Sequence, residues 1–177
     1  QDFFAAGMLD RAVSVFQELQ DSNNKWISKA GISESLRIIY EQTHEWQKAI
    51  DAALQTQKHQ KKELPENSIN ANSLISHYYC ELADEALLKC NLQEVDGFIS
   101  KAKKSNKQST RLISLQGDIS FHQKKYNEAL KHYLKVIRQD SRLLNVLLSK
   151  MDEAATKSES LSYLQSELLS IYDFTQD

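Results

Sequence analysis

The sequence predicts an all-α fold assembled from repeated pairs of helices. The 177 residues include one Pro and four Gly, a composition that suits long helices and disfavours a β-barrel or a β-sandwich. Small residues also recur at regular spacing, because Val95 and Ala129 are 34 residues apart, which is the period of one class of helix-turn-helix repeat. We therefore expect an α-solenoid of about five helix pairs, in which each pair contacts its neighbours.

Residues 111–142 carry the repeat pattern most completely. Gly117 allows the first helix to approach the second, and Tyr126 ends the turn between them. Ala129 occupies the point where the two helices cross, and Tyr133 fills the space beside it. These residue types, at these offsets, are typical of a tetratricopeptide repeat.

The same apolar stripe recurs along the chain. The crossing positions are Ala12, Ala49, Val95 and Ala129. Positions three before, four after and seven after each of them lie on one face of a helix, which a stacked repeat must bury. In that order, the residues at these offsets are Leu9, Trp46, Leu92 and Tyr126, then Phe16, Ala53, Ile99 and Tyr133, then Leu19, Thr56, Ala102 and Val136. Ala53 and Thr56 fit this stripe poorly, so the second repeat is partly degenerate.

The predicted repeats follow one another with one insertion. They cover residues 1–24, 25–58, 74–107 and 109–142, with a divergent pair at 143–173. In the first repeat we expect one helix to end near Ala6, a turn at Gly7 and a second helix over 9–20. Residues 57–72 hold the only proline and several asparagines, which predicts an inserted loop with a partly helical start. The chain begins at Gln1 rather than Met, and we expect a fragment of a longer protein.

The composition argues against several functional classes. A formal net charge of -2 gives no case for nucleic-acid binding, and no stretch approaches the roughly 18 apolar residues of a membrane span. Neither a nucleophile elbow nor a phosphate-binding glycine loop is present. Cys80 and Cys90 form no CxxC pair, and His77, Cys80 and Glu81 lack an opposing fourth ligand for zinc. We expect no catalytic residue, cofactor or metal in this chain.

The candidate binding site is the face that the first helix of each repeat presents to the concave groove. We also place Cys80 and Leu115 on this face. The polar members occupy positions where the fold itself is expected to need no polar group, which predicts partner contacts there. They are His77, Glu81, Asp84, Arg111, Ser114, Asp118 and His122. Acidic residues such as Glu34, Asp84 and Asp118 disfavour a clamp for a partner's C-terminal carboxylate.

Three segments carry a more specific likeness. They are DFFAAGMLDRA at 2–12, YEQTHEWQKAIDAA at 40–53 and HYYCELA at 77–83, and 117–141 continues it. These segments resemble the bacterial lipopolysaccharide assembly protein B family, also called LapB or YciM. The repeat template does not demand Gln47 or His77, so the likeness exceeds that of a generic repeat.

The resemblance implies a non-catalytic adaptor. Members of the family have an N-terminal inner-membrane anchor, cytoplasmic repeats and a C-terminal rubredoxin-like domain that binds zinc or iron. They link the protease FtsH to the deacetylase LpxC and so regulate lipid A synthesis. The alternatives are a generic peptide-binding or co-chaperone module and the regulatory repeat array of an enzyme such as a glycosyltransferase. A homodimer through exposed terminal faces stays open.

Overall fold

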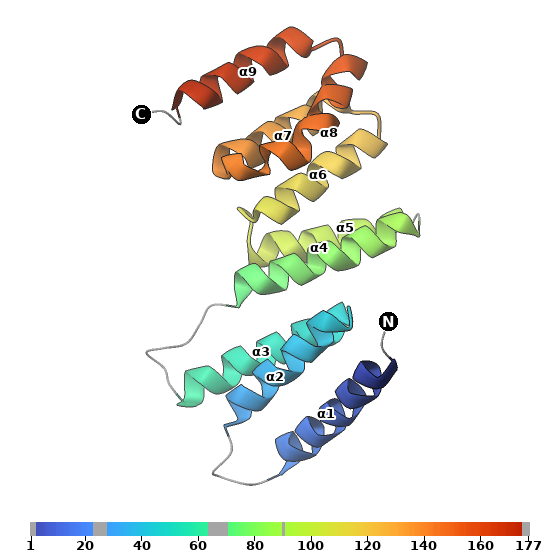
Figure 1. Cartoon of the computed structure of the whole chain (residues 1–177), viewed down its shortest axis with the longest axis vertical. Coiled ribbons are helices and arrows are strands. Elements are labelled where there is room, and N and C mark those ends of the chain that lie inside the picture. The colour runs from blue at the N-terminus through green and yellow to red at the C-terminus, as the bar shows by residue number, and fades with distance from the viewer. Residues whose placement is uncertain (1–2, 23–27, 64–70, 90, 175–177) are drawn as a thin grey trace. The chain divides into compact units, whose positions relative to one another are not determined.

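The computed structural model describes residues 3–22, 28–63, 71–89 and 91–174 (Figure 1). These residues form nine α-helices and one short 3₁₀ helix, with no strand in the described ranges. The all-α repeat architecture predicted from the sequence is therefore confirmed. The chain divides into two compact units, Gln1–Asn106 and Lys107–Asp177, which we call unit 1 and unit 2 and describe separately.

Unit 1 contains one helix followed by two helix pairs. Within it, α2 packs against α3 and α4 packs against α5, and the pairs meet through α3 and α4. The bounds are α1 Phe3–Asp21, α2 Lys29–Gln42, α3 Trp46–Glu63, α4 Asn72–Leu88 and α5 Leu92–Ser105.

Unit 2 also consists of helix pairs. Here α7 packs against both α6 and α8, and α9 packs against α8. The bounds are α6 Thr110–His122, α7 Tyr126–Gln139, the 3₁₀ helix Ser141–Leu143, α8 Leu144–Lys157 and α9 Leu161–Phe174.

Side chains just before several helices fix where those helices start. Ser28, Asn91 and Ser109 each accept a hydrogen bond from a backbone N–H in the first turn of α2, α5 and α6. We expected the first helix of the second repeat to begin at residue 25. The described part of α2 begins at Lys29, directly after the Ser28 cap, and residues 23–27 lie outside the described ranges.

Three of the turns between paired helices share one backbone geometry. His44, Lys124 and Glu159 have positive φ angles of 60°, 61° and 55°. The N–H of the next residue donates to the carbonyl five positions back in each turn, at 2.8, 2.9 and 2.8 Å. This is the Schellman arrangement that ends a helix with a left-handed residue. The two helices of these three pairs are thus joined by the same turn, although the turn sequences differ.

Two predicted helix boundaries are wrong. α1 runs without a break from Phe3 to Asp21, so Gly7 lies inside a helix and not in a turn. A single glycine costs a helix only about 1 kcal/mol, and no proline or capping residue accompanies Gly7 to end it. α3 extends to Glu63, beyond the predicted end near Lys58, because residues 58–63 contain no helix breaker. Residues 64–70 of the predicted loop lie outside the described ranges.

The apolar stripe lies in the core in both units. Ala49, Val95 and Ala129 are all almost fully buried, as the repeat frame predicts. Ala53 and Thr56, which fit the stripe poorly, are buried as well. The prediction fails at Leu92, the first residue of α5, which is 59% exposed. In α1 the corresponding side chains are only half-buried.

No helix in the described ranges combines the length and the apolar character that crossing a membrane requires.

Candidate partner-binding site

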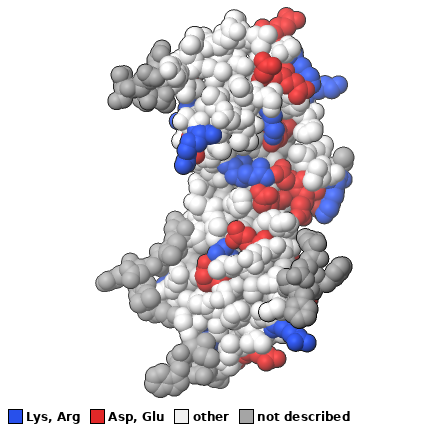
Figure 2. All heavy atoms as spheres, in the orientation of Figure 1, with Lys and Arg blue, Asp and Glu red and all other residues white. Residues whose placement is uncertain are grey.

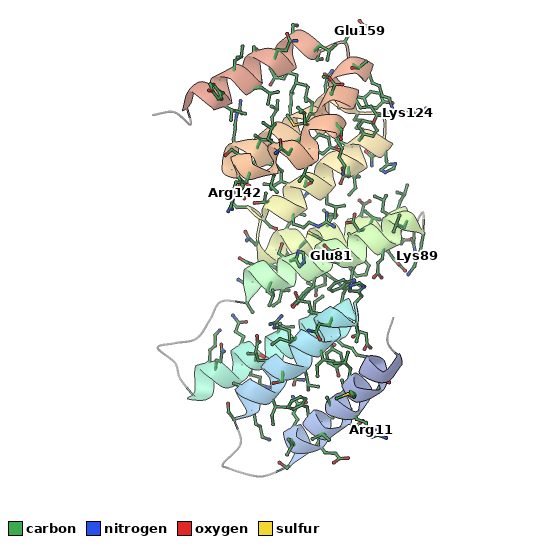
Figure 3. The ribbon with its side chains drawn as sticks, viewed as in Figure 1. Arg11, Glu81, Lys89, Lys124, Arg142 and Glu159 are labelled. Atoms are coloured by element: carbon green, nitrogen blue, oxygen red, sulfur yellow. The ribbon has the colours of Figure 1, made fainter. Side chains whose placement is uncertain are left out.

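The predicted site residues of unit 1 lie on one face of α4. His77, Glu81 and Asp84 are spaced by four and three residues, which places them in a row along the helix. All three are half-buried, and His77 Nδ1 lies 3.8 Å from Glu81 Oε1. Figure 3 places Glu81 midway along α4, and Figure 2 shows acidic side chains gathered over this helix. Unit 1 therefore presents a polar row with acidic character.

The other predicted site residues belong to α6 in unit 2. Arg111, Ser114 and Asp118 are half-buried and His122 is exposed, and their spacing again follows one face of a helix. The structure thus brings the seven predicted residues together as two sets, one in each unit. That these residues bind a partner remains a prediction.

Asp118 has a structural role that the sequence did not indicate. Its Oδ1 accepts a hydrogen bond of 2.8 Å from the buried Tyr133 hydroxyl and another of 2.7 Å from Lys150 Nζ. Burial, together with this carboxylate, raises the pKa of the Tyr133 phenol. The expectation that the fold needs none of the polar groove residues is therefore wrong for Asp118.

Two residues assigned to the groove are in the core instead. Cys80 and Leu115 are both 0% exposed. For Cys80 the reason lies one turn earlier, where Ser76 Oγ donates to the Ala102 carbonyl of α5 at 3.1 Å. Cys80 follows Ser76 by four residues and so shares the stripe of α4 that faces α5. Leu115 belongs to the buried stripe of α6 with Leu112.

Sequence reasoning missed a partly buried polar network between α2 and α4. Arg37 Nη1 donates to the Tyr78 hydroxyl at 2.6 Å and to Glu41 Oε2 at 2.5 Å. Tyr78 in turn donates to Glu41 Oε2 at 2.8 Å. Glu34 accepts from Arg37 through both carboxylate oxygens, at 3.0 and 2.6 Å. The spacing of Arg37 and Glu41 by one helical turn could have indicated their ion pair. Nothing in the sequence indicates that Tyr78, which belongs to another repeat, bonds to both of them.

The network shifts the pKa values of Tyr78 and Arg37. Burial raises the pKa of Tyr78 to about 12, and the hydrogen bond to Glu41 acts in the same direction. The side-chain hydrogen bonds to Glu34 raise the pKa of the Arg37 guanidinium despite its burial. Arg37 is thus a permanent cation whose charge is already balanced by its two carboxylate neighbours.

A row of aromatic rings lies beside this network. Trp46 is stacked between His44, at a centroid distance of 5.0 Å, and Tyr78, at 5.9 Å. The indole Nε1 donates to Glu85 Oε1 at 2.9 Å. These contacts tie the start of α3 to the middle and end of α4, and so hold the polar row of α4 in place.

No metal centre is assembled by the described part of the chain. None of its His, Cys, Asp and Glu side chains form a group of three or more that could hold an ion. His77, Cys80 and Glu81 do not form such a group, and Cys80 is fully buried.

Comparison with known proteins tests the resemblance. No family model matches the chain. Over 152 residues, however, it is 32% identical to lipopolysaccharide assembly protein B of Escherichia coli strain K12. The same identity is found with the proteins of that name from the O6:H1 strain CFT073 and from O157:H7. The resemblance to lipopolysaccharide assembly protein B that the sequence segments indicated is thereby confirmed.

The similarity covers 85% of this chain and 36% of each relative. The chain therefore spans about a third of the length of the lipopolysaccharide assembly protein B sequences that it matches. Because so large a share of the chain is aligned, the match includes most of the residues of α4 and α6, the helices that carry the candidate site.

Proposed function

We propose that this chain is the partner-binding repeat region of a non-catalytic adaptor that links the protease FtsH to LpxC and thereby restrains lipid A synthesis. The observation that carries the proposal is the 32% identity over 85% of the chain with lipopolysaccharide assembly protein B. The helical-repeat fold suits this role, because stacked helix pairs present extended surfaces to other proteins.

The polar row of α4 is the proposed contact surface for LpxC or FtsH. Its half-buried acidic groups, Glu81 and Asp84, stand on a helix that Ser76 and Tyr78 hold to α5 and α2. A rigid helix with a polar face can give a partner a defined register, and charged groups there contribute specificity and association rate.

The network around Arg37 argues against the co-chaperone alternative. A clamp for a C-terminal carboxylate needs cations whose charge is available to the ligand. Arg37 already donates to Glu34, Glu41 and Tyr78, and the two glutamates leave the cluster with net negative charge. Such a cluster repels a carboxylate and favours a partner that brings basic groups.

The test is the stability of LpxC in cells. Depleting the full-length protein should lengthen the half-life of LpxC, and re-expressing it should restore rapid turnover. A version that lacks the segment of residues 1–177 should fail to restore it, whereas full-length protein with the surface change Gly97→Ala should succeed. LpxC turnover that is indifferent to depletion would refute the proposal.

A further inference from the structure

The exposed side of α7 carries a line of basic side chains. Lys131, Lys135 and Arg138 are spaced by four and three residues, so they lie along one face of the helix over about 10 Å. We call these three residues the basic stripe. All three are exposed, whereas the other side of α7, with residues such as Leu134 and Ile137, belongs to the apolar core of unit 2.

The two lysines of the stripe carry charges that the fold does not neutralise. Neither the Lys131 nor the Lys135 ammonium has an ion-pair or hydrogen-bond partner among the described residues. Glu128, the acidic residue of α7, stands three residues before Lys131 and forms no ion pair with it. Arg138 is bound to Glu167 of α9, yet its side chain remains 56% exposed. The stripe therefore offers two unpaired ammonium groups and an accessible guanidinium.

Helix energetics disfavour this arrangement of cations. Lys131 and Lys135 are one turn apart, and like charges at this spacing destabilise a helix. In α2 and α8, by contrast, a cation pairs with a glutamate one turn away. Lys124 and Lys125 add two cations at the N-terminal end of α7, where the helix dipole disfavours positive charge. Groups that break a local rule with no gain to the fold are typical of a binding surface.

The basic character extends beyond the stripe within unit 2. Residues 107–138 contain seven Lys or Arg and only two Asp or Glu, and one of these two acids, Asp118, is already engaged by hydrogen bonds. Figure 3 shows Lys124 and Arg142 at the two ends of α7. Residues 71–99 of unit 1 have the opposite balance, with five Asp or Glu and one Lys. The two units therefore suit ligands of opposite charge.

We infer that the basic stripe of α7 binds an acidic segment of a partner protein, with carboxylates of that segment at Lys131 and Lys135. The inference rests on the proposed function, in which this repeat region joins two protein partners, and adds a second contact surface of opposite charge to the polar row of α4. Surfaces of opposite charge favour the correct partner at each site and repel the other.

The shape of the stripe favours a protein segment over a membrane surface. Side chains on one side of an extended segment are about 7 Å apart, close to the rise of about 6 Å between Lys131 and Lys135. Anionic membranes recruit clusters of about four to eight cations, whereas the stripe is a single line of three.

The test uses the ¹⁵N-labelled chain 1–177 and two short peptide probes that differ only in charge. One probe has Glu-Ser-Glu-Ser-Glu between Gly and Ser flanks, and the other has Gln-Ser-Gln-Ser-Gln. At low salt the glutamate probe should shift the amide signals of residues 131–138 and bind about tenfold more tightly than the glutamine probe. This preference should shrink at physiological salt, which screens attraction between exposed charges. Equal affinity for the two probes, or shifts confined to other helices, would overturn the inference.

Two double variants locate the probe. Lys131→Gln with Lys135→Gln should weaken binding of the glutamate probe at least about fivefold. The matched control, Lys103→Gln with Lys104→Gln, removes the same charge from exposed positions at the end of α5 and should leave probe binding unchanged. Both variants should remain helical by circular dichroism, because the altered side chains are exposed. Equal weakening by both variants would show that only the overall charge matters and would overturn the inference.

A lipid surface is the alternative occupant. Vesicles of phosphatidylcholine with about one-third phosphatidylglycerol should leave the amide signals of residues 131–138 unchanged. Vesicles that shift these signals while the glutamate probe does not would overturn the inference in favour of a membrane.

The outcome is separable from that of the proposed function. Stripe-dependent probe binding together with LpxC turnover that ignores the full-length protein would support the stripe and refute the FtsH–LpxC role. Normal dependence of LpxC turnover with no selective probe binding would refute the stripe alone.

Discussion

Gly117 faces the ring of Tyr133 so closely that no other residue fits between α6 and α7. A Cβ at Gly117 would lie 2.5 Å from Tyr133 Cε1 and 2.8 Å from Cδ1. The ring cannot move aside easily, because it is 1% exposed and its hydroxyl is bound to Asp118. The sequence-based assignment of Gly117 as the residue of close approach, with Tyr133 beside it, is confirmed.

Gly117→Ala should therefore lower the free energy of unfolding by about 1–3 kcal/mol through overpacking. The matched control is Gly97→Ala in α5, where an added Cβ meets nothing within 4 Å. That change should raise stability by about 0.5–1 kcal/mol, because alanine is the better helix former. Urea unfolding of both variants measures the difference. A Gly117→Ala protein as stable as the parent would mean that the two helices do not pack this closely.

Asp118→Ala should destabilise the chain by about 1–3 kcal/mol, because it leaves the buried Tyr133 hydroxyl without its acceptor. Ser114→Ala, on the same helix, should change stability by no more than about 0.5 kcal/mol. A double-mutant cycle with Tyr133→Phe isolates the hydrogen bond. Additive effects of the two single changes would contradict the assigned role of Asp118.

Lys124→Gly should stabilise unit 2 by about 0.5–1 kcal/mol, because Lys124 has φ of 61° and glycine adopts this left-handed conformation without strain. Lys125, the next residue, has an ordinary φ of -89°, so Lys125→Gly should bring no such gain. Thermal melting of the two variants provides the comparison. A destabilising effect of Lys124→Gly would count against the shared turn geometry.

Alkaline pH should weaken the α2–α4 contact. Tyr78 has a pKa of about 12 in the folded chain against an ordinary value of 10.0, so folding retains its proton. The stabilisation this provides is fully present below about pH 10 and is lost as the pH rises from about 10 to 12. Urea titrations across this range should show the decline.

Tyr78→Phe removes the titrating group of that contact. The variant should be less stable than the parent by about 1.5–3 kcal/mol at neutral pH, because hydrogen bonds to charged Arg37 and Glu41 are lost. Its stability should then fall less between pH 10 and 12. An identical alkaline decline in both proteins would show that Tyr78 is not responsible.

The sequence predicted the fold well where a local pattern determines it. The stripe around Ala49, Val95 and Ala129 depends on helical periodicity alone, and these residues are in the core. The predictions failed where one residue was given too much weight. Gly7 does not break α1, because one glycine cannot outweigh a helix that continues on both sides.

The candidate site was less predictable for a different reason. Whether Asp118 faces a partner or holds Tyr133 depends on a contact between two helices, and helical spacing gives only the direction of a side chain. The bond from Arg37 to Tyr78 joins residues 41 positions apart, which no local pattern reveals. The burial of Cys80 likewise follows from the way α4 meets α5.

The central claim is that the polar row of α4 contacts the partner. Isothermal titration of purified LpxC into the chain 1–177 tests it most directly, with the isosteric pair Glu81→Gln and Asp84→Asn. The matched control pair is Asp51→Asn and Asp96→Asn, which removes the same charge from exposed positions of α3 and α5. We predict that LpxC binds the parent and the control equally and binds the α4 variant at least about fivefold more weakly, while circular dichroism shows that the variant is still folded at the temperature of the titration. Equal affinity of LpxC for all three proteins would contradict the claim.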